Sequence, residues 1–194
     1  LINFGDTVTE ALENARLGND KTIELQVDLK DELMVYAHPL ELSRAVQNLF
    51  TNAQRYGRSE DGILRLHVNL GKDTDGKTAV LRVADEGRGL PVEERERVMR
   101  PFERGESARS GVTGTGLGLA IVDRIVRRSG GTVALDTNDP HGLMIIVRFP
   151  TKTADEIKAQ ETKAQKLAEK EEKKRQKIAK KARTSESSEE DSLS

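Results

Sequence analysis

The feature that constrains this chain most is a glycine-dense loop that runs directly into an apolar helix. Residues 111–119 read Gly-Val-Thr-Gly-Thr-Gly-Leu-Gly-Leu, and a helical apolar pattern covers residues 117–128. Gly114, Gly116 and Gly118 have no Cβ atom that would keep a phosphate away from the backbone amides. The helix start adds unpaired N–H groups and the positive end of the helix dipole. The pattern therefore predicts a phosphate-binding site.

The context of this loop excludes two common nucleotide-binding motifs, although a flexible turn before an ordinary helix stays an alternative. The spacing is G-x-G-x-G, not G-x-G-x-x-G, and residues 103–110 are polar where a dinucleotide-binding fold needs an apolar strand. The chain contains no G-x-x-x-x-G-K-[ST] sequence, so the loop is not a P-loop either.

Composition limits the remaining classes of function. A chain of 194 residues fits one domain with an appendage. The formal net charge of -1 is unevenly distributed, since residues 151–183 are basic and residues 184–194 acidic. The rest is mildly acidic, which argues against nucleic acid as the main partner. The absence of cysteine excludes disulfides and thiolate metal sites.

No run in this sequence is apolar and long enough to span a membrane. The sequence begins at Leu1 without an initiator methionine, so we expect a fragment of a longer protein, with any membrane segment upstream. The tail over residues 151–183 has almost no apolar face and predicts a solvated helix or a disordered arm. It would either solubilise the protein or contact lipid headgroups or nucleic acid. Residues 184–194 are expected to be disordered.

Apolar periodicity predicts an alternation of helices and strands. The expected helices cover residues 4–17, 40–56, 92–98 and 117–128. The expected strands form three hairpins, which pair residues 23–27 with 33–37, 63–70 with 78–84, and 132–135 with 143–149.

The helix over residues 40–56 carries polar residues beside its apolar stripe. Asn48, Asn52, Arg55 and Tyr56 are spaced i, i+4, i+7 and i+8, so their side chains project from one side of the helix. Helix interiors disfavour asparagine, because its amide competes for backbone hydrogen bonds. The set is either a solvated face or a site in which Asn52 gives an oxygen ligand to a hard cation such as Mg²⁺ beside a phosphate.

A carboxylate followed by glycines ends the strand over residues 78–84. Asp85 could accept a hydrogen bond from an exocyclic amine such as that of adenine, while Gly87 and Gly89 let a flat base approach the backbone. The alternative is a glycine turn between a strand and a helix. Farther along, Phe102 is expected to be a core residue. The loop over residues 103–113 is expected to be a lid beside the phosphate site.

Four motifs that occur in a fixed order resemble the N, G1, F and G2 boxes of the histidine-kinase catalytic and ATP-binding domain. They are Asn48-Leu-Phe-Thr-Asn52-Ala-Gln-Arg-Tyr56, Asp85-x-Gly87-x-Gly89, Pro101-Phe102 and Gly114-Thr-Gly-Leu-Gly-Leu119. The resemblance covers residues 7–150, and it is greatest to osmosensing kinases of the EnvZ type. It implies the Bergerat fold, a two-layer α/β sandwich in which a mixed, largely antiparallel sheet backs a layer of helices. Residues 1–150 would form this domain and residues 151–194 a charged tail, helical or disordered.

The same resemblance implies roles for individual residues around bound ATP and Mg²⁺. Asp85 would hold the adenine amino group, Gly87 and Gly89 would shape the base pocket, and Tyr56 would pack beside the nucleoside. Phe102 would anchor the lid.

On the phosphate side, the resemblance makes Asn52 the Mg²⁺ ligand and places Asn48 and Arg55 beside the phosphates. Arg104 or Arg109 would meet the γ-phosphate. The residues that would cap the phosphates are Thr115, Gly116, Leu117, Gly118 and Leu119.

The phosphoacceptor of such a kinase is expected to lie outside this sequence. The three histidines are His38, His67 and His141, and none has the His-Glu/Asp-x-x-[Thr/Asn]-Pro setting of the family. The resemblance therefore implies that this fragment binds Mg-ATP but cannot phosphorylate itself. Its partners would be the dimerisation and histidine-phosphotransfer domain of the same kinase and the receiver domain of a response regulator. The whole protein would be a homodimer in the bacterial inner membrane, with this domain in the cytoplasm.

Two other functions are compatible with the same motifs. The related gyrase-, Hsp90- and MutL-like ATPases use a carboxylate base four residues before the metal-binding asparagine. Here that residue is Asn48, which cannot accept a proton from water at neutral pH, so we expect negligible hydrolysis. A nucleotide-sensing adaptor that works by binding a partner is the non-enzymatic alternative, and absence of ATP binding would favour it.

Overall fold

The computed structural model describes residues 1–18, 21–30, 32–103 and 116–151, with separate positions between 156 and 172. The chain divides into two compact units, Leu1–Thr151 and Lys152–Ser194. The described positions of the second unit are helical, and the Thr162 hydroxyl donates to the carbonyl of Lys158 at 2.8 Å. Within the described part of the chain, no helix is both long and apolar enough to cross a membrane.

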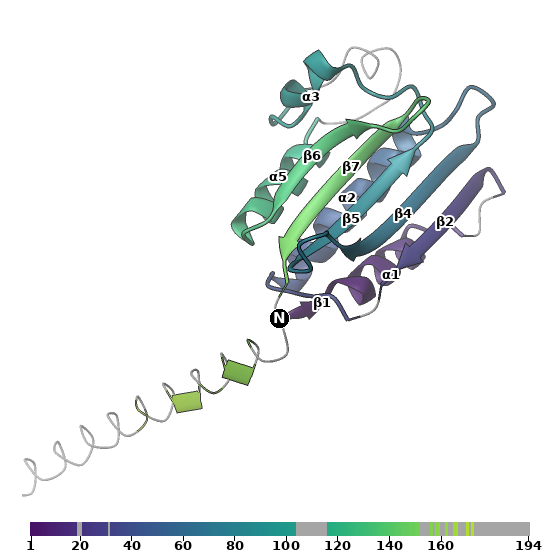
Figure 1. The fold of residues 1–194 in the computed structure, drawn as a ribbon. Coiled ribbons are helices and arrows are strands. Elements are labelled where there is room, and N and C mark those ends of the chain that lie inside the picture. The colour runs from purple at the N-terminus through teal and green to yellow at the C-terminus, as the bar shows by residue number, and fades with distance from the viewer. Residues whose placement is uncertain are drawn as a thin grey trace, which may run out of the picture. The chain divides into compact units, whose positions relative to one another are not determined.

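A five-stranded mixed sheet forms one layer of the first unit (Figure 1). In spatial order its strands are β2 (Ile23–Leu29), β4 (Leu64–Lys72), β5 (Thr78–Asp85), β7 (Leu143–Pro150) and β6 (Thr132–Thr137). Only the β2–β4 pair is parallel. The β4–β5 and β6–β7 hairpins confirm two of the three hairpins that the sequence predicts.

The first predicted hairpin is wrong. β3 (Met34–Val35) does not return along β2 but pairs antiparallel with β1 (Ile2–Asn3) in a separate two-stranded sheet. β2 instead lies parallel to β4, where the register places Leu25 beside Leu66. Ile23, Leu25 and Leu29 of β2 therefore pack, half-buried, against the core of the main sheet, and Val27 stays exposed. The nearness of β2 and β3 in the sequence does not reveal this pairing.

Helices cover one face of the sheet and form the second layer (Figure 1). They are α1 (Phe4–Asn14), α2 (Pro39–Tyr56) and α5 (Gly118–Arg128), and α2 packs between the other two. Pro39 lies in the first turn of α2, where its missing N–H costs nothing, and Gly57 caps the other end. The short α3 (Val92–Val98) follows β5 at the residues predicted.

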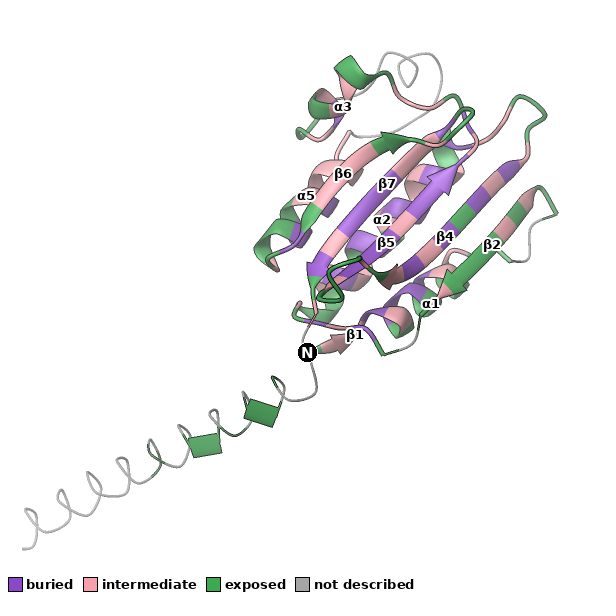
Figure 2. Cartoon of the chain, in the orientation of Figure 1, coloured by how far each residue is buried: buried purple, intermediate pink, exposed green. Residues whose placement is uncertain are grey.

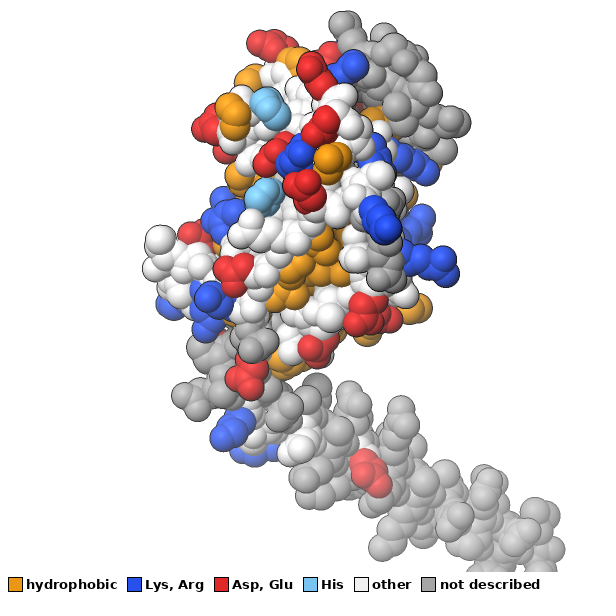
Figure 3. All heavy atoms as spheres, turned by 90° about the vertical axis from the view of Figure 1, so that its right-hand side faces the viewer, with side chains coloured by type: hydrophobic (Ala, Val, Ile, Leu, Met, Phe, Trp, Pro, Cys, Tyr) orange, Lys and Arg blue, Asp and Glu red, His pale blue; other side chains and the backbone are white. Residues whose placement is uncertain are grey.

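The core lies between the two layers (Figure 2). In α2 the predicted stripe is buried and comprises Leu42, Ala45, Val46, Leu49, Phe50 and Ala53. In β4 the alternate residues Leu64, Leu66, Val68 and Leu70 are buried. Phe4 and Phe149 meet edge to face, with ring centroids 5.3 Å apart. On the side of the molecule seen in Figure 3, acidic and basic side chains are interspersed around an apolar area. The predicted two-layer α/β architecture is confirmed.

Candidate functional site

Asp85, the last residue of β5, is a buried carboxylate with one oxygen fixed by the backbone. The residue is 7% exposed, and its Oδ1 accepts the N–H of Gly87 at 3.0 Å and that of Leu143 at 3.2 Å. Burial raises the pKa of Asp85 above its ordinary value, and the two N–H donors oppose this rise. No described residue donates a hydrogen bond to Oδ2. This oxygen is therefore the acceptor that a ligand amine can use.

Glycines let the end of α2 approach the loop after Asp85. A Cβ at Gly57 would lie 2.7 Å from the Cβ of Asp85, and a Cβ at Gly87 would lie 2.7 Å from the carbonyl oxygen of Tyr56. Gly89 has φ +69°, and its Cβ would lie 2.8 Å from the carbonyl oxygen of Gly142. Contacts within the protein therefore require glycine at positions 87 and 89. The sequence alone suggests a different reason for these glycines, namely space for a flat base.

Arg95 ties α3 and the loop before it to the end of β6. Its Nη2 donates to the Thr137 hydroxyl at 2.6 Å, and its Nη1 donates to the carbonyl of Leu135 at 3.3 Å. Its Nε donates to the carbonyl of Leu90 at 3.4 Å. The chain after Asp85 is therefore fixed to the same end of the sheet that carries the carboxylate.

Asn52 lies where α2 meets the start of α5. A Cβ at Gly118 would be 2.9 Å from Asn52 Oδ1, so the absence of a side chain there lets the amide lie against the helix start. Asn52 Nδ2 is buried and has no hydrogen-bond partner among the described residues. An unsatisfied buried polar group costs about 1–3 kcal/mol, which a bound polar ligand could recover. One turn earlier, Asn48 Nδ2 donates to the carbonyl of Arg44 at 3.0 Å, which leaves the Asn48 oxygen available.

Phe102 and Gly116 join the two ends of the segment predicted to be a lid. The Phe102 N–H donates to the carbonyl of Gly116 at 3.0 Å. Gly116 has φ +68°, and a Cβ there would lie 2.9 Å from the carbonyl oxygen of Glu103. The Phe102 side chain is 77% exposed, so the expectation of a core residue is wrong. With φ +66° at Phe102, the chain turns sharply and makes this contact through its backbone.

The family model described as "Histidine kinase-, DNA gyrase B-, and HSP90-like ATPase" matches residues 37–153. The chain belongs to this family. Its curated relatives include the sensor histidine kinase CpxA of Escherichia coli K12, which is 35% identical over 117 residues, or 60% of this chain and 24% of CpxA. The histidine-protein kinase/phosphatase MprB of Mycolicibacterium smegmatis is 34% identical over 142 residues, or 73% of this chain and 27% of MprB. The chain thus spans about a quarter of the length of these relatives.

Solved structures agree with this assignment. The structure of the mycobacterial sensor histidine kinase MprB matches with a TM-score of 0.67 and 30% identity, over 78% of this chain and 96% of that one. The kinase domain of the E. coli osmosensor EnvZ matches with a TM-score of 0.53 and 34% identity, over 79% of this chain and 89% of that one. On the basis of these similarities, the first unit is a histidine-kinase ATP-binding domain.

The kinase domain brings five of the predicted site residues together in two groups along α2. Asp85, Gly87 and Tyr56 meet at the C-terminal end of the helix, where Tyr56 is 38% exposed. Asn52 and Gly118 meet farther back along it. Gly89, Asn48, Arg55, Phe102, Gly116, Leu117 and Leu119 are also described, and Arg55 is exposed. Arg104, Arg109 and Thr115 lie outside the described residues.

Three further residues support this site and were not predicted. Gly57 could have been found, since it directly ends the asparagine-bearing helix. Asn138 and Gly142 lie in the turn between β6 and β7 and contact Asp85 from far along the chain. Such a contact cannot be inferred from one sequence without the order of the strands.

Proposed function

We propose that this domain binds Mg-ATP and transfers the γ-phosphoryl group to a histidine on the dimerisation domain of the same kinase. The observation that carries this proposal is the buried Asp85 carboxylate, with Oδ1 held by two backbone N–H groups and Oδ2 left for a ligand. An acceptor fixed in this way suits the exocyclic amine of adenine. Tyr56, Gly87 and Gly89 would line the space around the base.

The phosphate side of the proposal rests on Asn52 and its surroundings. The orphaned amide of Asn52 lies beside the start of α5, and an asparagine oxygen is a suitable ligand for Mg²⁺ after rotation of the amide. Among the described residues there is no cluster of three or more His, Cys, Asp or Glu that could hold a metal. Mg²⁺ would therefore take most of its ligands from phosphate and water, and when bound it would neutralise phosphate charge.

The remaining groups of the phosphate side would act by position and charge. Asn48 and Arg55 project from α2 toward this side in the proposal, and Arg104 or Arg109 would meet the γ-phosphate. The residues proposed to cap the phosphates are Thr115, Gly116, Leu117, Gly118 and Leu119. Phosphoryl transfer needs mainly such positioning and charge neutralisation.

Hydrolysis of ATP by water is disfavoured by the residue at position 48. The Asn48 amide already donates to the carbonyl of Arg44, and an amide oxygen is too weak a base to activate water at neutral pH. We therefore propose a kinase and not an ATPase.

The phosphoacceptor of the proposed reaction belongs to another domain. His38 directly precedes α2, His67 lies on β4 with Nε2 3.5 Å from Glu86 Oε1, and His141 is exposed in the β6–β7 turn. None is on a helix of the described part of the chain, where a phosphoacceptor would be presented. In the proposal the phosphoryl group passes from the separate histidine to the aspartate of a response regulator. The whole protein would be a homodimeric membrane sensor with this domain in the cytoplasm.

Radiolabelled ATP tests this function directly. The chain alone, with Mg²⁺, is expected to bind ATP without becoming labelled, because it lacks the acceptor. Addition of the separately purified dimerisation domain of the same kinase should produce acid-labile phosphohistidine on that domain. Phosphohistidine on this chain, or rapid steady-state phosphate release by the chain alone, would contradict the proposal.

Asn52→Ala is expected to remove most of the Mg²⁺ dependence of ATP binding. Affinity in excess Mg²⁺ should fall about tenfold, the effect of losing one polar contact to a charged group. The free energy of unfolding should not fall, because the buried Nδ2 has no partner to lose and alanine is the better helix former. Titration calorimetry with Mg²⁺ and with EDTA measures the first effect, and thermal denaturation the second.

Asn69→Ala is the matched control for this variant. The Asn69 amide donates to Asp28 Oδ2 at 3.0 Å on the exposed surface of β4 and β2, so its loss should leave ATP affinity unchanged. An Asn52→Ala protein that keeps the full difference between Mg²⁺ and EDTA would remove Asn52 from the metal site.

A further inference from the structure

The turn between β6 and β7, together with the first residue of β7, holds the main chain and the side chain of Asp85. Asn138 Nδ2 donates to the backbone carbonyl of Asp85 at 2.9 Å, and Leu143 N–H donates to its Oδ1 at 3.2 Å. Asn138 N–H donates to the carbonyl of Gly142 at 3.2 Å, which closes the turn. The turn and the residue that follows it therefore fix both the main chain and the carboxylate of Asp85.

The end of the strand ladder explains why Asp85 needs this support. The register between β5 and β7 ends at the pair Ala84 and Met144, so the carbonyl of Asp85 lies one position beyond the last pair. The next N–H of β7, that of Leu143, bonds to the side chain of Asp85 and not to its carbonyl. The Asn138 amide therefore supplies the hydrogen bond that the carbonyl of Asp85 would otherwise accept from a backbone N–H of β7.

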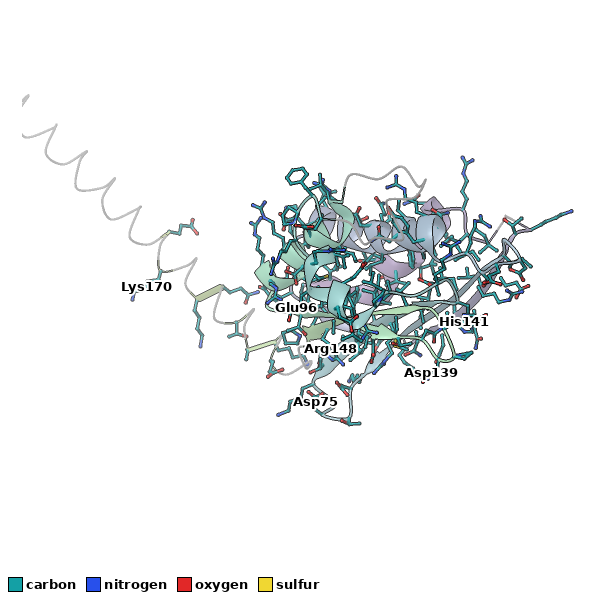
Figure 4. The ribbon with its side chains drawn as sticks, turned by 90° about the horizontal axis from the view of Figure 1, so that it is seen from above. Asp75, Glu96, Asp139, His141, Arg148 and Lys170 are labelled. Carbon is teal, nitrogen blue, oxygen red and sulfur yellow. The ribbon has the colours of Figure 1, made fainter. Side chains whose placement is uncertain are left out.

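Among the polar side chains of this turn, Asn138 is the one that faces the site. Figure 4 shows Asp139 and His141 in the same turn, and both are exposed. Asn138 is half-buried, and its hydrogen bond reaches a residue 53 positions earlier in the chain. A residue that served only to close the turn would need its backbone N–H alone.

We propose that Asn138 is a positioning residue for adenine recognition, which acts by holding Asp85 so that Oδ2 faces the amino group of the base. This inference rests on the proposed function. When the donor at Asn138 is lost, the carbonyl of Asp85 loses the side-chain hydrogen bond that fixes it to this turn. The carboxylate can then shift away from the position in which Oδ2 meets the base, while the phosphate side is not affected.

Two triphosphates separate this role from a general structural one. ATP carries the 6-amino group that Asp85 would accept, and purine riboside 5′-triphosphate lacks it. In Asn138→Ala we expect ATP affinity to fall about five- to tenfold, the equivalent of one hydrogen bond, while affinity for purine riboside triphosphate changes less than about twofold. Calorimetry or competition binding on the full chain with Mg²⁺ gives both values, and Asn69→Ala should change neither.

Asn138→Asp is the second variant, because aspartate keeps the shape and turn preference of asparagine but has no donor. It should lose the preference for ATP at least as fully as Asn138→Ala, with the cooperative unfolding transition retained. Equal losses for both triphosphates, or full preservation of the preference in either folded variant, would overturn the inference. Failure of the unmodified chain to bind either triphosphate would instead contradict the proposed function.

Discussion

Asp85→Asn is expected to weaken ATP binding by about ten- to a hundredfold, the cost of leaving a buried polar group of the complex unsatisfied. The asparagine oxygen can keep both N–H bonds at the Oδ1 position, those from Gly87 and Leu143. The amide nitrogen then occupies the Oδ2 position, where it presents N–H donors to the amino group of adenine, which is also a donor. Attraction is replaced by a clash between donors, and the fold is left intact.

Titration calorimetry on the full chain with Mg-ATP measures this loss. Asp28→Asn is the matched control, because Asp28 is exposed on β2 and, among the described residues, its carboxylate accepts a hydrogen bond only from Asn69. The control should bind ATP as the unmodified chain does. If Asp85→Asn also retained full affinity, Asp85 would have no place in the base site.

The same variant should be more stable than the unmodified chain at neutral pH when no nucleotide is bound. Burial raises the pKa of Asp85 in the folded state, so the folded chain keeps its proton at pH values where the unfolded chain has lost it. Stability of the unmodified chain therefore falls as pH rises from the ordinary aspartate pKa through the raised one. The advantage of Asp85→Asn should be absent well below about pH 4 and complete above the folded pKa. Chemical denaturation at several pH values gives this difference, and a constant difference would contradict it.

Gly142→Ala is expected to destabilise the kinase domain by about 2–5 kcal/mol, from backbone strain and overpacking together. Gly142 has φ +122°, which L-residues rarely adopt, and a Cβ there would overlap the carbonyl oxygen of Asp85. For a domain of this size the thermal midpoint should fall by roughly 5–15 °C. ATP affinity should fall as well, because the turn can accommodate the methyl group only by moving away from Asp85.

Gly76→Ala is a reference for a positive φ without a steric contact. Gly76 also has a positive φ, +65°, but nothing lies within 4 Å of the position of its Cβ. It should therefore cost only the conformational term, about 1–2 kcal/mol, and should not affect ATP binding. Equal losses of stability in the two variants would show that the contact between Gly142 and Asp85 has no energetic importance.

Local pattern was sufficient to predict most elements of this fold. The apolar stripe of α2 and the alternation in β4 predict their buried faces, because both depend on the period of the element alone. The partner of β2 was mispredicted, since two apolar strands close in sequence can pair with each other or with different neighbours. Phe102 was mispredicted because its positive φ and its contact with Gly116 depend on the path of the chain, not on hydrophobicity.

The sequence predicts those residues of the candidate site that belong to short local motifs. Asp85 and Asn52 are distinctive because neither residue suits the secondary structure in which it lies: aspartate is uncommon in strands, and asparagine is unfavourable inside helices. Residues that break such preferences often belong to functional sites. Asn138 carries no such signal, since asparagine is ordinary in a turn. Its role follows only from the strand order, which brings the β6–β7 turn beside the end of β5.

The hydrogen bond between Phe102 and Gly116 has a consequence for how such domains can diversify. Because the two residues are joined through their backbones, whatever sequence lies between them starts and finishes at the same two points. Exchanging residues 104–115 for a longer or shorter segment of another kinase should then leave α5 and the adenine side undisturbed. The Phe102–Gly116 pair is therefore a fixed junction at which one domain can accept connecting segments of different sequence and length.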